Sequence, residues 1–212
     1  FGPMAASNRF DQKDVYMPIT PMFHVHGWGF PYAATLLGVK QVYPGSYKPD
    51  HLLSLINKER VSFSHCVPTI LHMLLKANEV KPFDLSHWKV VIGGSSLPQG
   101  LASAALENGI NVFAAYGLSE TCPLLTVAQI DRDYEDDLTA RCRAGWPAPL
   151  VDLRIVDEYM NDIPRDGFST GELVVRAPWL TIGYVKNKAA TEELWRGDYL
   201  HTGDVGRFDD NG

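Results

Sequence analysis

Cysteine is scarce in this sequence, with only Cys66, Cys122 and Cys142 standing far apart among 212 residues. An odd number of cysteines without a CxxC pair excludes a disulfide framework and a cysteine-rich metal knuckle. Long apolar runs are lacking too, since no stretch approaches the roughly 20 residues of a membrane span, and no signal peptide opens the chain. We therefore expect a soluble protein of a reducing compartment, located in the cytoplasm and without a transmembrane segment.

Blocks of basic residues are also absent. The 19 Lys and Arg residues are outnumbered by 25 Asp and Glu residues, and the net charge of −6 is spread along the chain. This balance argues against nucleic-acid partners and against a polybasic membrane patch. A nucleotide ligand is still compatible with it, because backbone amides and a metal can bind phosphate without a basic surface.

The first part of the chain alternates between strand-like and helix-like segments. Strands are predicted over Val15–Phe23, Val39–Tyr43, Val61–Cys66, Lys89–Ile92 and Asn111–Ala115. Helices are predicted over Trp28–Leu37, Pro49–Glu59, from Pro68 onward, and Pro98–Asn108. Strands separated by helices of about ten residues indicate βαβ units and a largely parallel sheet.

The character of the sequence changes after about Gln129. An acidic stretch, Asp131–Asp137, is followed by short alternating strands at Val151–Val156 and Gly171–Arg176, and by a helix at Ala189–Arg196. Gly and Pro recur about every ten residues there, which is typical of a small antiparallel sheet or barrel. The predicted fold class is therefore α/β: a βαβ domain over residues 1–128, then a β-rich, barrel-like domain over residues 129–212.

Unusual residues follow two of the predicted parallel strands. Gly93-Gly94-Ser95-Ser96 comes after Val90–Ile92, where glycines let a ligand approach the backbone and the next helix offers free amides. The alternative there is a plain strand–turn–helix connection. Tyr116–Thr121 follows the next strand and supplies a ring for base stacking, hydroxyls at Ser119 and Thr121, and a Mg²⁺-binding carboxylate at Glu120. A tight turn before a capped helix is the alternative, but both loops are expected at one sheet edge.

Two further segments carry candidate ligand groups. Asp204, in Tyr199-Leu200-His201-Thr202-Gly203-Asp204, could accept the hydrogen bonds of a ribose diol or simply order its own turn. His24 and His26 would share a face if they lay on a strand, which makes a metal pair conceivable. No cysteine or carboxylate cluster stands nearby to complete such a site. The sequence also contains no nucleophile elbow and no GxxxxGK phosphate loop.

Taken in order, these motifs resemble the adenylate-forming enzymes, which include acyl-CoA synthetases, luciferases and adenylation domains. Tyr116–Glu120 is similar to the family's Tyr-Gly-x-(Ser/Thr)-Glu, Thr170–Leu173 to its Thr-Gly-Glu-Leu, and Tyr199–Asp204 to its (Tyr/Phe)-x-x-Thr-Gly-Asp. Gly183-Tyr184 resembles the Gly-Tyr between the last two. The segment Pro21–Val25, together with Trp28 and Pro31–Thr35, looks closest to medium- and long-chain fatty-acid–CoA ligases.

The resemblance implies a role for each matching residue toward ATP. Tyr116 would stack on adenine, flanked at the base edge by Gly94, Ala114 and Ala115. Ser119 would contact the α-phosphate, Glu120 would hold Mg²⁺, and Asp204 would bind the ribose hydroxyls. Glu120 and Ser119 are thus the expected catalytic residues. Val25 and Trp28 would line the acyl channel near the nucleotide, with Trp28 as its gate and His24 at the carboxylate.

The implied activity joins a fatty acid to coenzyme A in two steps, through an acyl-adenylate, with ATP converted to AMP and pyrophosphate and Mg²⁺ as the required metal ion. The alternatives are an aryl- or short-chain-acid–CoA ligase and a non-catalytic nucleotide-binding module. The family's phosphate loop and its C-terminal domain have no counterpart in the sequence, so we expect a fragment of the large N-terminal domain, inactive alone. A homodimer of the full-length protein is a further expectation.

Overall fold

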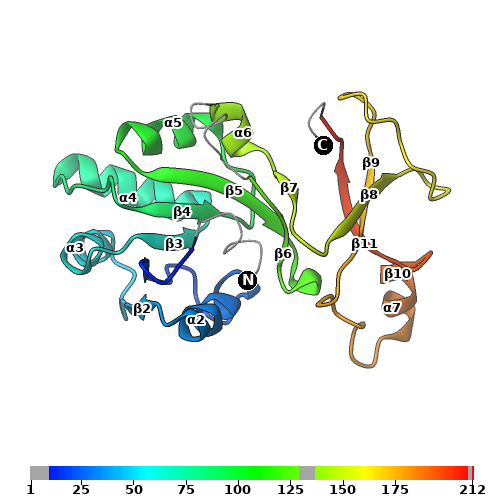
Figure 1. Ribbon diagram of the computed structural model, residues 1–212, viewed down its shortest axis with the longest axis horizontal. Helices are drawn as coiled ribbons and strands as arrows, with labels where there is room; N and C mark the ends of the chain where they lie inside the picture. The colour runs from blue at the N-terminus through cyan, green and yellow to red at the C-terminus, as the bar shows by residue number, and fades with distance from the viewer. Residues whose placement is uncertain (1–9, 129–136, 210–211) are drawn as a thin grey trace.

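A computed structural model describes residues 10–128, 137–209 and 212, and places them in two sheets (Figure 1). The larger, seven-stranded sheet has the order β2-β1-β3-β4-β5-β6-β7. Its strands are β1 (Val15–Tyr16), β2 (Lys40–Gln41), β3 (Phe63–Cys66), β4 (Lys89–Ile92), β5 (Asn111–Gly117), β6 (Leu124–Val127) and β7 (Trp146–Pro147). β1 to β5 pair in parallel, and β6 and β7 add antiparallel strands at one edge.

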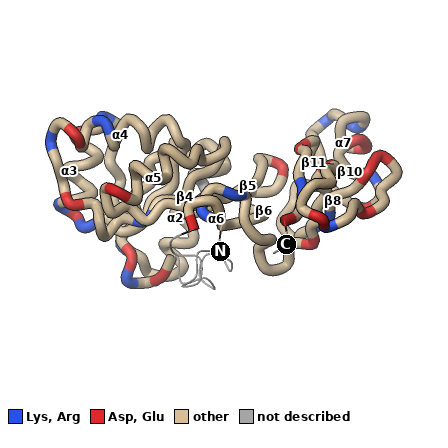
Figure 2. The backbone as a smooth tube through the Cα atoms, turned by 90° about the horizontal axis from the view of Figure 1, so that it is seen from above, with Lys and Arg blue, Asp and Glu red and all other residues tan. Residues whose placement is uncertain are grey.

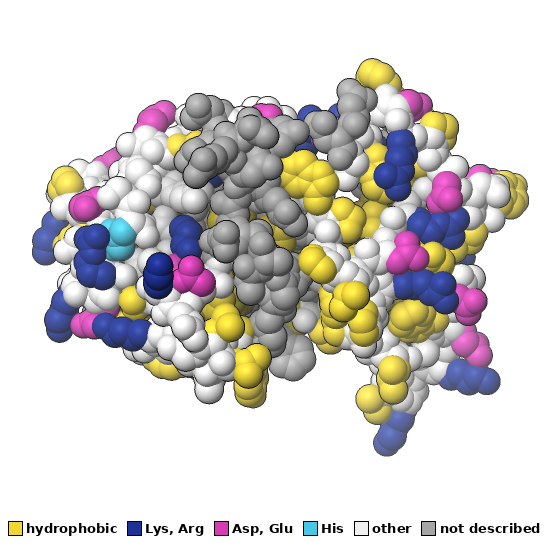
Figure 3. Space-filling view, viewed as in Figure 1, with side chains coloured by type: hydrophobic (Ala, Val, Ile, Leu, Met, Phe, Trp, Pro, Cys, Tyr) yellow, Lys and Arg dark blue, Asp and Glu magenta, His cyan; other side chains and the backbone are white. Residues whose placement is uncertain are grey.

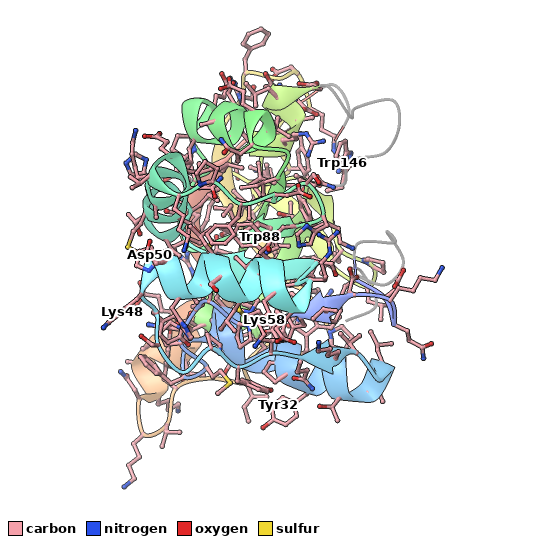
Figure 4. All side chains as sticks on the ribbon, turned by 90° about the vertical axis from the view of Figure 1, so that its left-hand side faces the viewer. Tyr32, Lys48, Asp50, Lys58, Trp88 and Trp146 are labelled. Carbon is pink, nitrogen blue, oxygen red and sulfur yellow. The ribbon has the colours of Figure 1, made fainter. Side chains whose placement is uncertain are left out.

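Helices cover both faces of this sheet, and together they form the part that we call the α/β lobe. One face carries α3 (Pro49–Glu59), α4 (Pro68–Val80) and α5 (Gln99–Glu107), with the short α6 (Leu138–Cys142) beside α5; the other carries α2 (Val25–Leu37). Figure 4 looks onto α3, with Trp88 in the layer behind it and Tyr32 on the outer rim of α2. The lobe thus has three layers.

Local sequence accounts for these elements. Pro49 and Pro68 open α3 and α4, where a missing amide hydrogen costs nothing and the fixed φ suits the first turn. Leu52, Leu53 and Ile56 of α3 then face the sheet at helical spacing and are buried. Alternation along β5 sends Ala114 into the core under α3–α5 and Phe113 into the core under α2.

The second sheet has four antiparallel strands in the order β10-β11-β9-β8. They are β8 (Asp152–Val156), β9 (Gly171–Arg176), β10 (Trp195–Arg196) and β11 (Tyr199–Gly206), and α7 (Lys188–Leu194) precedes β10. We call this part the β lobe. Leu180, Leu194 and Leu200 form its core, against which Tyr116 of the α/β lobe also packs. Charges of both signs alternate over the two lobes without a long run of either (Figure 2).

The predicted fold class is confirmed, with differences in several elements. β1 ends at Tyr16 instead of Phe23, because Pro18 has no amide hydrogen to continue the ladder that Met17 still joins through Phe63. β6, β7 and α6 were not expected. Trp146–Pro147 pairs with Thr126 and Val127, so the larger sheet runs past residue 128, while the domain division proposed there stays a prediction.

Two other sequence features concern residues partly outside the described ranges. Residues 131–136 of the acidic stretch lie outside them, as do Asp210 and Asn211, whose Asp-Asn-Gly sequence with Gly212 is typical of a hairpin turn. Asp137, in contrast, caps α6 through the amides of Thr139 and Ala140. Within the ranges that the structure describes, no helix combines the length and apolar character needed to cross a membrane.

Candidate active site

The two predicted loops lie side by side at the carboxyl edge of the larger sheet. Ile92 of β4 pairs with Ala114 of β5, so Gly93-Gly94 and Tyr116 leave neighbouring strands at the same level. Gly94 has φ +79°, a left-handed conformation that favours glycine. At Gly117, a Cβ atom would fall 1.7 Å from the carbonyl oxygen of Pro123, so only glycine lets the chain turn there.

A cavity of about 610 Å³ opens between this edge and α2, and we call it the α2 cavity. The predicted site residues that line it are His24, Val25, Gly94, Ala115, Tyr116 and Ser119. The remaining wall is mostly apolar, with Phe30, Val67, Val91, Leu124 and Trp179 among its residues. The cavity therefore joins a hydrophobic space to the turn that carries the hydroxyl and carboxylate groups.

Other predicted residues lie elsewhere. Ala114 points into the core on the opposite face of the sheet, so of the two alanines Ala115 alone lines the α2 cavity. Trp28 belongs to α2, but its side chain is outside the described part of the structure. Asp204 lines a second hollow of about 670 Å³ between the lobes, together with Tyr116, Trp146, Leu173 and Phe208. We call this hollow the interlobe groove; Tyr116 lines both spaces.

Asp204 is presented by an irregularity in β11. The pairing of β11 with β9 shifts register between His201 and Val205, as in a β-bulge, and Gly203 has φ +74°. The hydroxyl of Thr202 donates to the carbonyl of Leu173 over 2.8 Å, and the amide of Gly203 donates to the carboxylate of Glu172 over 3.1 Å. The Thr-Gly-Glu-Leu segment thus holds the Thr-Gly-Asp segment, and the two motifs form one structural unit.

Two tyrosine–carboxylate hydrogen bonds cross between the lobes in opposite directions. The hydroxyl of Tyr116 donates to Oδ2 of Asp204 over 2.5 Å, and the hydroxyl of Tyr184 donates to Oε1 of Glu120 over 2.7 Å. Burial and the Asp204 bond raise the pKa of Tyr116, and the Glu120 bond raises that of Tyr184, so both phenols stay protonated donors. Both predicted carboxylates therefore have a partner on the other lobe.

A loop of the β lobe contacts Glu120 at two points. Besides the Tyr184 bond to its side chain, the amide of Thr181 donates to the main-chain carbonyl of Glu120 over 2.9 Å. The indole of Trp195 donates in turn to the carbonyl of Thr181 over 3.2 Å. These contacts hold Glu120 in place from the facing lobe. Figure 3 shows hydrophobic side chains where the two lobes meet and charged side chains toward the two ends of the molecule.

The two histidines do not form a pair on one face. His24 ends a turn and is exposed, and α2 starts at Val25 with the amide of Gly27 donating to the carbonyl of His24 over 2.8 Å. Residues two apart on a helix point in different directions. Burial lowers the pKa of His26 to about 4, so its ring is neutral. No group of three metal-binding side chains of the His, Cys, Asp or Glu type occurs in the described residues.

The arrangement of these residues suits a reaction in which the protein positions the substrates and supplies no nucleophile of its own. Among the described residues, no Ser–His or Cys–His hydrogen bond that would activate a nucleophile is present. Burial raises the pKa of Cys66 to about 12, which keeps this thiol unreactive. What the site offers is an apolar cavity, two carboxylates and a glycine turn. Such a set can orient an acid against a nucleotide and leave the bond-making to the substrates.

Comparisons with known proteins agree with this geometry. The family model described as AMP-binding enzyme matches residues 3–185. The chain belongs to the AMP-binding enzyme family. A long-chain-fatty-acid–CoA ligase of Thermus thermophilus is 38% identical over 209 residues, which are 95% of this chain and 39% of that protein. A 3-methylmercaptopropionyl-CoA ligase of Ruegeria pomeroyi is 34% identical, over 96% of this chain and 39% of its own length. The chain thus spans well under half of these relatives.

Solved structures share the fold of this chain. A long-chain-fatty-acid–CoA ligase of Archaeoglobus fulgidus superposes with a TM-score of 0.86 at 24% identity, over 99% of this chain and 44% of that one. An O-succinylbenzoate coenzyme A synthetase of Bacillus subtilis, in complex with ATP and magnesium ion, gives 0.82 at 23% identity, over 98% and 43%. The relatives are acid–CoA ligases, and they differ in the acid.

Sequence reasoning missed some residues of this candidate site. Tyr184 was noted within its Gly-Tyr motif, but nothing in the spacing indicated its bond to Glu120, which lies 64 positions earlier. Trp179 and Phe30 line the α2 cavity without belonging to any motif. Phe30 could have been found from the helix, because it lies four positions after His26 and therefore on the same face.

Proposed function

We propose that the full-length protein is an AMP-forming ligase that joins a medium- or long-chain fatty acid to coenzyme A. The observation that carries this proposal is the α2 cavity, whose wall is mostly apolar and whose mouth holds Tyr116 and Ser119, next to Glu120. A hydrocarbon chain gains free energy by leaving water for such a cavity, at about 25 cal/mol per Å² buried. The Thermus relative, itself a long-chain-fatty-acid–CoA ligase, supports the choice of acid.

The chemistry proceeds between substrates. An oxygen of the fatty-acid carboxylate attacks the α-phosphorus of ATP, the bond to the bridging oxygen breaks, and pyrophosphate leaves with its electron pair. The sulfur of coenzyme A then attacks the acyl carbon of the adenylate, giving up its proton, and AMP departs as the thioester forms. Both steps need orientation and charge neutralisation more than a protein nucleophile. Ser119 is assigned to the α-phosphate, and His24 to the entering carboxylate.

The nucleotide is assigned to residues of both lobes. Tyr116 offers its ring to adenine, with Gly94, the backbone of Ala114, and Ala115 along the base edge. Asp204, which accepts from Tyr116, is assigned to the ribose hydroxyls. Val25 lines the acyl side of the α2 cavity, and Trp28, one helical turn further on, is its proposed gate.

Magnesium fits the residues at hand. Mg²⁺ is commonly bound by one or two carboxylates plus substrate phosphates, and Glu120 offers a carboxylate next to Ser119, which lines the α2 cavity. Its Oε1 accepts from the hydroxyl of Tyr184, which fixes the orientation of the carboxylate that would hold the ion. The bound ion would neutralise the charge that develops on the phosphates. Coenzyme A is proposed as the thiol because the similar proteins named above are coenzyme A ligases.

Two other functions are compatible with the same site. An aryl- or short-chain-acid–CoA ligase would keep both steps and change only the acid, as in the relative named 2-succinylbenzoate–CoA ligase. A non-catalytic nucleotide-binding module would keep the site and lose both steps. It is disfavoured because Glu120, Ser119 and Asp204 are all present. The location in the cytoplasm and a homodimer of the full-length protein stay predictions.

The test is AMP formation by the full-length protein with ATP, Mg²⁺ and coenzyme A, across acids from acetate to palmitate plus benzoate. AMP that rises with medium or long acids is the expected result. A preference for acetate or benzoate would favour the second function. No AMP with any acid, from a folded protein that binds ATP, would contradict the proposal and favour the non-catalytic module.

A further inference from the structure

The floor of the α2 cavity is made by one row of residues across the sheet. His65 of β3 pairs with Val91 of β4, which pairs with Phe113 of β5. Two positions further along each strand, on the same face, stand Val67, Gly93 and Ala115, and these three smaller residues line the cavity. In the preceding row only Val91 lines the cavity, whereas the rings of His65 and Phe113 on either side of it do not.

His65 lies behind that floor in a packed group of rings. It is fully buried, its centroid lies 4.8 Å from the stacked ring of Phe30, and it lies 4.9 Å from the ring of His26. Phe30 and His26 come from α2 and line the cavity, so His65 supports the lining residues from the sheet side. The ring group continues away from the cavity through Tyr16 and Phe63, both fully buried.

The position of His65 is fixed by a hydrogen bond. The hydroxyl of Tyr16 and Nε2 of His65 are 2.7 Å apart, both in the interior. A buried polar pair of this kind resists displacement, because separating the two groups would leave each of them without a partner. His26 is also confined, since a Cβ atom at Gly93 would lie only 3.1 Å from its Cε1 atom. This end of the cavity is therefore a rigid wall.

We propose that His65, held by Tyr16 and packed against His26 and Phe30, ends the acyl part of the α2 cavity and selects medium-chain over long-chain acids. The inference rests on the proposed function, which leaves both classes open. An acyl chain that starts at the Ser119 turn and runs between α2 and the sheet meets this wall. His65 acts through the residues that line the cavity, and it is thus a specificity-determining residue.

The first test compares chain lengths in the full-length protein. The double variant Tyr16→Phe/His65→Ala removes the ring without leaving the tyrosine hydroxyl unpaired. The ratio of kcat/KM for palmitate to that for octanoate should rise about tenfold or more, because a few methylenes gain room in a hydrophobic pocket. His87→Ala is the matched control: His87 is a partly buried histidine that bonds the carbonyl of Ile56, on the α3 side of the sheet. It should leave the ratio unchanged.

Binding provides a readout that does not depend on turnover. Octanoyl- and palmitoyl-sulfamoyladenosine mimic the two acyl-adenylates, and calorimetry gives the Kd of each. Wild type should bind the octanoyl compound more tightly, and the double variant should lose that preference. A wild type that prefers the palmitoyl compound, or a folded double variant with an unchanged preference, would overturn the inference. Should the analogues bind as expected while no AMP forms, the proposed function fails and the inference stands.

A substitution in the opposite direction guards against a variant that does not fold. Val67→Phe enlarges a residue of the lining row, on the cavity side of His65. It should shift the preference from octanoate toward hexanoate in turnover and toward the hexanoyl analogue in binding. An unchanged order of these acids in folded Val67→Phe would also contradict a wall at this end of the cavity.

Discussion

The two lobes contribute to the site in different ways. The α/β lobe supplies it from the ends of buried parallel strands, with Tyr116 directly after Ala115 at the end of β5. The β lobe supplies Tyr184 from a loop and Asp204 from an irregular stretch of β11, and both side chains are exposed. The first lobe offers rigid walls, whereas the second offers groups that can respond to a ligand. The crossed bonds Tyr116–Asp204 and Tyr184–Glu120 are where the two meet.

The largest expected effect is that of Glu120→Gln on the α/β side of this junction. Without a charged oxygen for Mg²⁺, the rate of AMP formation by the full-length protein should fall about 100-fold or more, as when charge stabilisation is removed elsewhere. Glu107→Gln, at the end of α5, is the control and should leave the rate unchanged. A rate for Glu120→Gln close to that of wild type would remove the metal role.

The buried histidines predict that acid destabilises the α/β lobe first. The pKa of His26 is lowered from 6.5 to about 4, so at pH values between these the unfolded state binds a proton that the folded state does not. Stability is therefore lost as pH falls through this window, by about 2 kcal/mol for His26 between pH 7 and pH 5. Burial lowers the pKa of His65 as well, which acts in the same direction.

Amide hydrogen exchange, corrected for the intrinsic effect of pH, measures this lobe by lobe. Protection of α2 and β3 should fall between pH 7 and pH 5, while protection of β8 and β9 changes less. The variant His26→Asn should flatten the dependence in α2. Equal loss of protection in both lobes would show that these histidines do not set the acid response.

A smaller effect is expected for Tyr184→Phe on the β side of the junction. Losing one hydrogen bond to an exposed carboxylate should raise the Mg²⁺ concentration for half-maximal rate about threefold. Tyr199→Phe is the matched control, since its hydroxyl makes a 2.7 Å bond to Asp152 in the same lobe, away from the site. The same shift in both variants, or in neither, would contradict a positioning role for Tyr184.

The sequence predicted helices and strands correctly where the interactions that form them lie within a short stretch of the chain. Proline openings and helical spacing predicted α3 over its observed bounds, and alternation predicted β9 likewise. The meeting of the Gly94 and Tyr116 loops followed from the parallel sheet. By contrast, α2 was predicted from Trp28, although it starts at Val25, because its first turn is set by the preceding Pro21–His24 turn.

What could not be predicted depends on residues far apart in the chain. No local signal pairs Tyr184 with Glu120 or stacks Phe30 on His65, because these contacts exist only once the lobes and layers are assembled. The orientation of Ala114 follows from alternation along β5, yet the family resemblance grouped it with Ala115. Motifs thus indicated the candidate site, and packing determined which of their side chains line its cavity.

The central claim is that both lobes build one nucleotide site. The most direct test is the exchange of labelled pyrophosphate into ATP, measured with and without a fatty acid. The full-length wild type should catalyse exchange only when a fatty acid is present. In Asp204→Asn, which changes the β lobe alone, the KM for ATP should rise about tenfold, the size expected for a lost charged hydrogen bond to ligand. Exchange with an unchanged KM for ATP in folded Asp204→Asn would contradict a shared site.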